Sequence, residues 1–271
     1  MNKRSFLKSF SLIGLGSITP AFSLDRWIQK HDGIDALQLS GDEAFWSGIR
    51  RGYRLKSDYI NLENGCYCIQ PEETLEHFIS HVREVNYQGA YYMRTVQAEN
   101  KQRAAARLAE LVQCPADELI ITRNTTESLD MIIGGLDWKQ GDEAVMAEQD
   151  YGSMLNMFKQ VSQRHGTVNR IISLPNHPVS DEEIVNLYAS AITPKTRLLM
   201  VCHIVNITGQ ILPVRKIADM AHERGVLVMV DGAHAVAHIQ FKMSDLHCDF
   251  YGASLHKWLS VPLGAGILHV K

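Results

Sequence analysis

The sequence predicts an α/β protein with a mainly parallel β-sheet that is covered by helices on both faces. Three observations lead to this prediction. Strand and helix patterns alternate after a polar segment that ends near Ser57. The strands are short, continuous apolar runs, as in sheets buried on both faces. The chain has 271 residues, which is enough to bury the core of one large domain.

The elements follow one another in regular order. The first clear helix covers residues 98–114, because its apolar residues recur at helical spacing and Pro115 closes it. Further helices are predicted over 125–136, 154–166, 180–192 and 214–225. The strands between them are predicted over 118–124, 143–149, 169–174, 197–205 and 226–232, with another apolar run near 249–256. Ligands of such sheets bind beyond the carboxyl ends of the strands, so polar residues at those ends are the first to consider.

Composition and charge exclude some classes of function. The formal net charge of −3 and the pI of about 6.5 show no basic excess, and basic residues are not clustered with aromatic ones, so we expect no nucleic-acid partner. The five cysteines are scattered and form no CxxC motif. This spacing favours neither a zinc site nor a disulfide framework.

The N-terminus has the pattern of an export signal. Lys3, Arg4 and Lys8 precede a short apolar run and small residues near Ala21, and the run is too short to be a stable membrane span. The letters KRSFLK resemble a twin-arginine motif, which indicates a periplasmic or otherwise exported protein. We therefore divide the chain into an export signal (1–23), an N-terminal segment (24–60) and one large domain (61–271).

Three polar residues follow predicted strands: Asn206, Asp231 and Lys257. A carboxylate that ends a buried strand needs a cation or a strong donor. A lysine in a desolvated pocket has a lowered pKa and becomes a nucleophilic amine, as a Schiff base with an aldehyde cofactor requires. The pair therefore suits pyridoxal phosphate, in which the carboxylate would face a protonated ring nitrogen. Thr125 and Thr126 begin a helix and provide a seat for its phosphate.

Five ordered motifs now point to a family. TRNTTES, EQDYGSML, HIVNITGQILPV, VDGAHAVAH and ASLHKW together extend over about residues 60–271. The chain resembles the class V aminotransferases, which include the cysteine desulfurases and the isopenicillin N epimerase-like enzymes. The resemblance implies the large domain of an aspartate aminotransferase-type (fold type I) enzyme that depends on pyridoxal 5'-phosphate.

The resemblance also implies roles for single residues. Lys257 would hold the cofactor as an internal aldimine and then move protons, and Asp231 would pair with the ring nitrogen. The ring hydroxyl would be contacted by His234 and Asn206, and Tyr151 would stack on the ring. The phosphate would be held by Thr125, Thr126, Ser254 and His256. A tyrosine at position 151 is more similar to the epimerase-like branch than to the desulfurases.

The expected activity is that of an aminotransferase or epimerase acting on an amino acid, in a homodimer. One alternative is a carbon–sulfur lyase or cysteine desulfurase. A second is an inactive, truncated cofactor-binding protein, because the family normally continues past the lysine into a small C-terminal domain, which we expect to be absent here. A third is a metal-dependent hydrolase using Asp231, His234 and His238, although our main prediction contains no metal. Residues 86–94, rich in tyrosine and glycine, are the candidate substrate mouth.

Overall fold

The computed structural model describes residues 22–271. The predicted export signal (1–23) therefore lies outside the described residues except for its last two positions. The described chain forms two compact units: one contains the residues up to Leu111 together with Ser260–Pro262, and the other contains Val112–Leu259 and Leu263–Lys271. The predicted boundary at residue 60 does not coincide with this division and stays a prediction. No helix within residues 22–271 is long and apolar enough to cross a bilayer.

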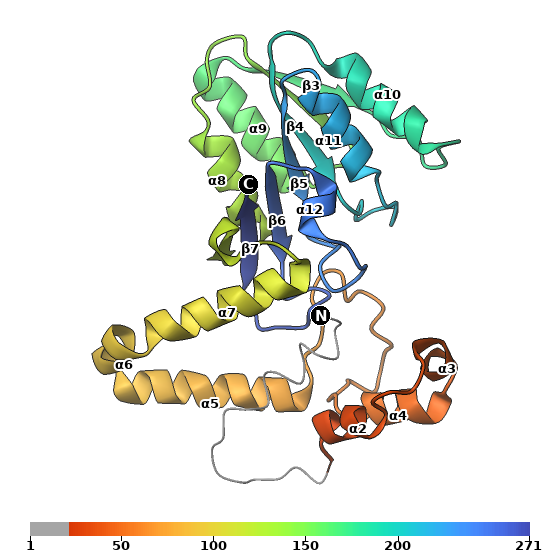
Figure 1. Cartoon of the computed structure of the whole chain (residues 1–271), viewed down its shortest axis with the longest axis vertical. Helices are drawn as coiled ribbons and strands as arrows, with labels where there is room; N and C mark the ends of the chain where they lie inside the picture. The colour runs from red at the N-terminus through yellow and green to blue at the C-terminus, as the bar shows by residue number, and fades with distance from the viewer. Residues whose placement is uncertain (1–21) are drawn as a thin grey trace. The chain divides into compact units, whose positions relative to one another are not determined.

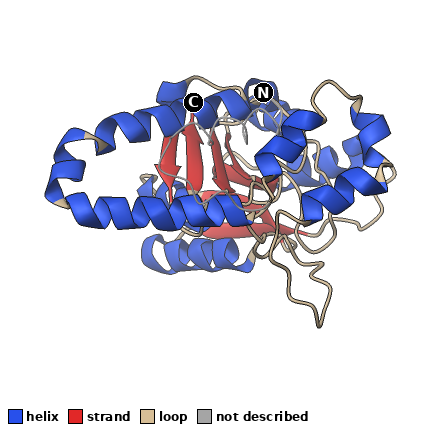
Figure 2. Ribbon diagram, turned by 90° about the horizontal axis from the view of Figure 1, so that it is seen from below, coloured by secondary structure: helices blue, strands red, loops and turns tan. Residues whose placement is uncertain are grey.

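The first unit is helical. Its elements are α2 (Leu24–Lys30), α3 (Ala36–Ser40), α4 (Glu43–Arg50), α5 (Glu72–Gln88), α6 (Ala90–Thr95) and α7 (Gln97–Val112), the last of which ends at the start of the second unit. Figures 1 and 2 show α5 and α7 as two long helices connected by α6. The Tyr92 hydroxyl links them, because it lies 3.2 Å from His81 Nε2 of α5 and accepts a hydrogen bond from Asn100 of α7.

The second unit is the predicted α/β structure. Its strands are β1 (Leu119–Thr122), β2 (Glu143–Ala147), β3 (Val168–Ile172), β4 (Thr196–Cys202), β5 (Leu227–Asp231), β6 (Phe250–Ser254) and β7 (Gly266–Val270). They form a sheet in the order β1-β7-β6-β5-β4-β2-β3. The five strands from β6 to β3 are parallel, and β7 is antiparallel to both of its neighbours. The prediction of a mainly parallel sheet is therefore confirmed.

Helices cover both faces of this sheet (Figure 1). The helical elements of the second unit are η1 (Ala116–Glu118), α8 (Thr125–Gly135), α9 (Gly152–His165), α10 (Asp181–Ala191), α11 (Val214–His222) and α12 (Met243–Leu246). Helices α8 and α9 pack on each other and on one face, whereas α10 and α11 pack on each other and on the opposite face. Gly166 ends α9 in the left-handed conformation, with a φ of 71°, which glycine adopts at little cost.

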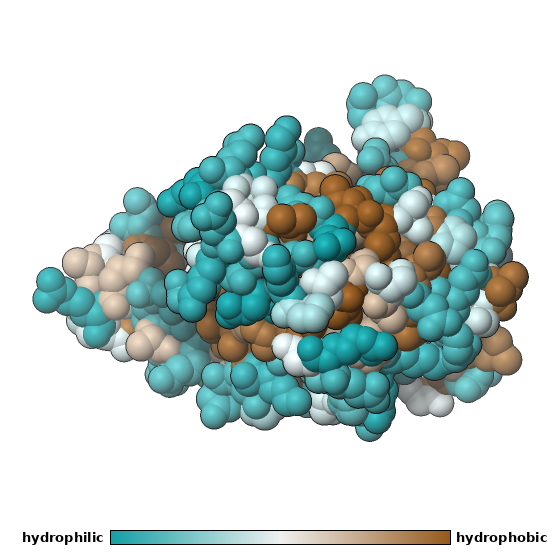
Figure 3. Space-filling view, turned by 90° about the horizontal axis from the view of Figure 1, so that it is seen from above, coloured by the Kyte–Doolittle hydropathy of each residue, from teal (hydrophilic) through white to brown (hydrophobic). Residues whose placement is uncertain are grey.

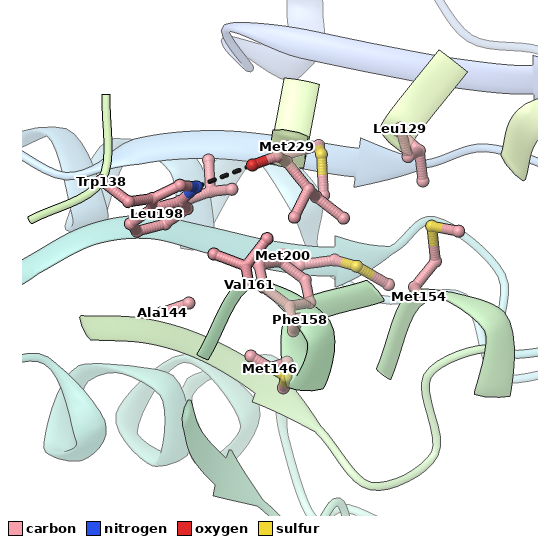
Figure 4. Close-up of a cluster of buried hydrophobic side chains, with 11 residues drawn as sticks. Leu129, Trp138, Ala144, Met146, Met154, Phe158, Val161, Leu198, Met200 and Met229 are labelled. Atoms are coloured by element: carbon pink, nitrogen blue, oxygen red, sulfur yellow. Dashed lines mark hydrogen bonds between the residues drawn. The ribbon is translucent and has the colours of Figure 1, made fainter. Parts of the chain in front are cut away.

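The core beneath α8 and α9 explains why the strands hold their register. Alternate residues of β2 and β4, such as Met146 and Met200, point to the same face, where they meet Leu129 and Phe158 from the helices (Figure 4). The Trp138 indole closes one end of this core and donates a hydrogen bond of 2.7 Å to the Ile133 carbonyl. A slip of one residue would move these side chains to the other face, so the core fixes where each strand ends.

The face of the molecule that is seen from the top of Figure 1 is mixed in polarity. Figure 3, seen from the top of Figure 1, shows mostly hydrophilic residues with smaller groups of hydrophobic residues between them. Such a surface is ordinary for a globular protein, because polar atoms cannot cover all of it. It contrasts with the five-strand parallel region, in which β2 is buried along its whole length.

Candidate functional site

The carboxyl ends of four parallel strands meet at one edge of the sheet, which we call the carboxyl edge. Strands β2, β4, β5 and β6 end there at Ala147, Cys202, Asp231 and Ser254. The end of β1 lies at the same edge, because Thr122 and Ser254 both pair with Gly266 of β7. The segments that follow these strands carry the predicted site residues, so the topology brings them to one side of the sheet.

The start of α8 forms one part of this edge. The Thr125 amide donates a hydrogen bond of 2.9 Å to Ser254 Oγ, and the two hydroxyl oxygens lie 2.8 Å apart. The Asn124 side chain caps the helix by accepting a hydrogen bond from the Glu127 amide. The amide of Thr126 keeps no partner among the described residues. The edge therefore presents hydroxyls and an amide at the positive end of a helix dipole.

Asp231 is the last residue of β5 and is only 4% exposed. Its Oδ1 accepts a hydrogen bond of 2.9 Å from the Ala233 amide. Burial raises the pKa of Asp231 above its usual value, and the Ala233 amide and positive charge at Lys257 offset this only in part. A buried carboxylate of this kind is stabilised most by a cation or by a strong hydrogen-bond donor.

Lys257 and His234 face each other at the same edge as Asp231, whose pKa responds to the charge of Lys257. Lys257 Nζ lies 3.0 Å from His234 Nε2 and 5.9 Å from the centre of the Tyr151 ring. Burial lowers the pKa of His234 to about 4, and the charges of Lys257 and His238 make smaller contributions in the same direction. This imidazole is therefore neutral at pH 7. The edge thus combines an amine, a neutral imidazole and the face of an aromatic ring.

The other predicted residues are placed less closely. His256 is half-buried next to Lys257, and its Nδ1 is buried without a hydrogen-bond partner among the described residues. Asn206 lies in an exposed turn four residues beyond β4, and within residues 22–271 no hydrogen bond joins its side chain to the cluster. The candidate substrate mouth, residues 86–94, covers the end of α5 and most of α6 in the first unit. The roles of these residues stay predictions.

The structure adds polar residues that the sequence analysis did not select. Asp150, the residue before Tyr151, is buried and accepts hydrogen bonds from the Ala147 amide and the Cys202 thiol. Burial raises its pKa to about 7, with a contribution from the charge of Asp231. His203 follows β4 directly, and its amide donates to the Asp231 carbonyl. The reasoning that selected Asp231, a polar residue after a buried strand, would have found both.

The alternative of a metal site is wrong. Among residues 22–271 there is no group of three His, Cys, Asp or Glu side chains that could hold a metal ion. The alternative needed Asp231, His234 and His238 at helical spacing. Asp231 instead ends a strand, and turns rather than a helix follow it. His238 stacks on the Trp258 ring, with ring centres 3.8 Å apart.

Comparisons with known proteins give one matching family model and several similar proteins. The family model described as "Aminotransferase class-V" matches residues 69–271. The isopenicillin N epimerase of Streptomyces clavuligerus is 31% identical over 230 residues, which are 84% of this chain and 57% of that protein. A probable cysteine desulfurase of Halalkalibacterium halodurans is 26% identical over 222 residues, which are 79% of this chain and 54% of that protein.

Solved structures show the same likeness. A mutant of C-DES with glycine covalently linked to its pyridoxal phosphate cofactor has a TM-score of 0.74 and 25% identity, covering 82% of this chain and 59% of that one. The cystine C–S lyase C-DES in complex with its product, cysteine persulfide, has a TM-score of 0.70 and 27% identity, covering 77% and 56%. The chain thus spans less than two thirds of the length of each of these relatives.

Proposed function

The chain belongs to the class V aminotransferase family, whose cofactor is pyridoxal phosphate, and on this basis we propose that it acts on an amino acid as an aminotransferase or epimerase. The observation that carries the proposal is the arrangement at the carboxyl edge. A buried carboxyl group with a raised pKa ends a strand at the same edge as an amine that faces a neutral imidazole. Perturbed groups gathered at strand ends are typical of active sites.

The residues present fit the cofactor at three points. Asp231 is buried with a raised pKa and would pair with a protonated ring nitrogen. Nδ1 of His256 is buried without a partner and would gain one from a phosphate oxygen. The Thr126 amide and the Thr125 and Ser254 hydroxyls lie at the start of α8, where an anion is stabilised.

When bound, the cofactor would supply an aldehyde able to condense with an amine and a ring that draws electrons from the substrate. Lys257 would provide that amine and would take and return a proton at the substrate α-carbon. Asp231 would hold the proton on the ring nitrogen. His234 would donate toward the ring hydroxyl, and Tyr151 would cover one face of the ring.

A carbon–sulfur lyase is the second candidate, because the cystine C–S lyase C-DES is among the similar structures. A cysteine desulfurase also needs a reactive cysteine. Cys202 lies at the carboxyl edge but does not suit that role, because it is buried and its thiol pKa is raised far above its usual value by burial and by Asp150. We therefore place the lyase before the desulfurase.

Product analysis separates these activities. The 271-residue chain is loaded with pyridoxal phosphate and mixed with a panel of L-amino acids and cystine. An aminotransferase gives oxo acids, an epimerase gives D-amino acids, and a lyase gives persulfide from cystine. We expect one of the first two products. Persulfide alone would favour the second candidate, and an absorption spectrum unchanged by every amino acid would favour an inactive binding protein.

We also propose that the protein forms a homodimer through the first unit. Helix α5 buries none of its described side chains, and Phe78 and Val82 are 43% and 50% exposed. In α6, Tyr91 is 67% exposed. Burial of such apolar groups against a partner lowers the free energy of the assembly. Light scattering should give twice the chain mass, and a Phe78→Glu/Val82→Glu variant should be monomeric; a monomeric wild type would contradict the proposal.

Export is a separate proposal that rests on the basic and apolar pattern of residues 1–23. Expression with residues 1–23 intact should place the protein outside the cytoplasm, with the signal removed. A Lys3→Gln/Arg4→Gln variant should stay in the cytoplasm. If the wild type stays there uncleaved, residues 1–23 are not a signal.

A further inference from the structure

Three side chains at the carboxyl edge form a chain of hydrogen bonds. The indole Nε1 of Trp258 donates to His234 Nδ1 at 3.2 Å. The other ring nitrogen of His234, Nε2, lies 3.0 Å from Lys257 Nζ. Trp258 thus contacts the imidazole on the side opposite the amine.

The chemistry of the indole fixes the protons along this chain. An indole N–H can donate a hydrogen bond but cannot accept one, so His234 Nδ1 must be the acceptor. A neutral imidazole carries one N–H, which therefore lies on Nε2. A protonated imidazole would place a second N–H against the indole N–H and is excluded by this contact.

The tautomer also sets where the remaining N–H lies. With its proton on Nε2, His234 directs this N–H to the side on which Lys257 lies, 3.0 Å from Nζ. This is the N–H that the proposed function directs toward the ring hydroxyl of the cofactor.

We propose that Trp258 is a positioning residue that holds His234 in the Nε2–H tautomer, so that this imidazole presents an N–H to the ring hydroxyl of the cofactor. The proposal deepens the proposed function and rests on it. It assigns a role to a residue that has no chemistry of its own in the reaction.

Two observations support this role. The Trp258 ring is held in place by His238, which stacks on it at 3.8 Å with an interplanar angle of 11° and lies with Nδ1 3.0 Å from the His234 carbonyl. The low pKa of His234, about 4, keeps the imidazole neutral at pH 7, as the contact with the indole requires.

The test compares Trp258→Phe with Trp138→Phe in the full 271-residue chain. Both substitutions keep an aromatic ring and remove one indole N–H, but Trp138 donates to the Ile133 carbonyl in the core. Before the cofactor is added, ¹⁵N NMR of labelled histidine reads the His234 tautomer, with the signal assigned through His234→Gln. Absorption at pH 7 then follows the rate at which each protein captures pyridoxal phosphate.

We expect the wild type and Trp138→Phe to show His234 with its proton on Nε2. Trp258→Phe should show a mixture of tautomers and capture the cofactor about two- to tenfold more slowly, the range that the loss of one hydrogen bond gives. A proton on Nδ1 in the wild type, or an unchanged tautomer and capture rate in Trp258→Phe, would overturn the assignment. If the wild type captures no cofactor, the proposed function fails, and the NMR result still decides the role of Trp258.

Discussion

Gly232 directly follows Asp231, and replacing it with alanine tests whether the carboxylate is held in place by close packing. A Cβ atom at this position would lie 2.1 Å from Cε1 and Cζ of Tyr251. The Tyr251 ring is fully buried, lies beside Phe241, and has its hydroxyl 3.0 Å from His203 Nδ1. The backbone of Gly232 is also fixed, because its amide donates to the Gly252 carbonyl at 2.8 Å. Neither side of the contact can move without breaking other contacts.

We therefore expect Gly232→Ala to lower the free energy of unfolding by about 2–3 kcal/mol, the upper part of the range for overpacked cores. For a unit of this size that corresponds to a fall in Tm of about 4–12 °C. Thermal unfolding followed by circular dichroism measures it. Because Asp231 moves with the backbone, cofactor binding should weaken as well.

Gly152→Ala is the matched control. Gly152 begins α9, and a Cβ atom there would meet nothing within 4 Å. We expect the control to be neutral or stabilising by up to about 1 kcal/mol. If Gly232→Ala unfolds at the same temperature as the wild type and binds the cofactor equally well, the close packing of Gly232 against Tyr251 is refuted.

Three further substitutions test other parts of the account. Asp231→Asn should leave the fold intact and lower the turnover rate by about a hundredfold or more, because a neutral amide cannot hold the ring proton; a rate within threefold of wild type would contradict this. Arg170 and Thr193 lower the pKa of Glu143 to about 2, so its stabilising effect is complete above its usual pKa of 4.5 and is lost as the pH falls toward 2. The difference in Tm between wild type and Glu143→Gln should shrink over that interval, and a constant difference would exclude this cause. Phe158→Ala should lower the free energy of unfolding, measured with urea, by about 3–5 kcal/mol. Val179 is 92% exposed, so Val179→Ala should change it by less than about 0.5 kcal/mol. Equal effects of the two substitutions would contradict the core assignment.

The sequence was sufficient for elements whose signals are local. Helix α8 begins at Thr125, as predicted, because the Asn124 side chain caps it. Helix α10 begins after Ser180, close to the start of the predicted helix over 180–192, because the Ser180 hydroxyl accepts a hydrogen bond from the Glu183 amide and caps it. Strands β4 and β5 were found from their apolar runs, since both are buried on two faces.

Other features depend on contacts between distant residues. Strand β7 is antiparallel to β6 and β1, and nothing within Gly266–Val270 specifies that direction. Helix α5 was missed, and none of its described side chains is fully buried, so its apolar residues do not mark out a core face in the sequence. The contact of Trp258 with His234 depends on how two side chains are turned, which spacing along the sequence does not reveal.

The amine of Lys257 is central to the account, and borohydride trapping tests it most directly. The chain is mixed with pyridoxal phosphate, treated with borohydride and digested, and the modified peptide is located by mass spectrometry. We expect an absorption band near the visible edge that disappears on reduction, with the label on Lys257 and neither signal in Lys257→Ala. A label on other lysines alone, or an identical spectrum in Lys257→Ala, would contradict the account.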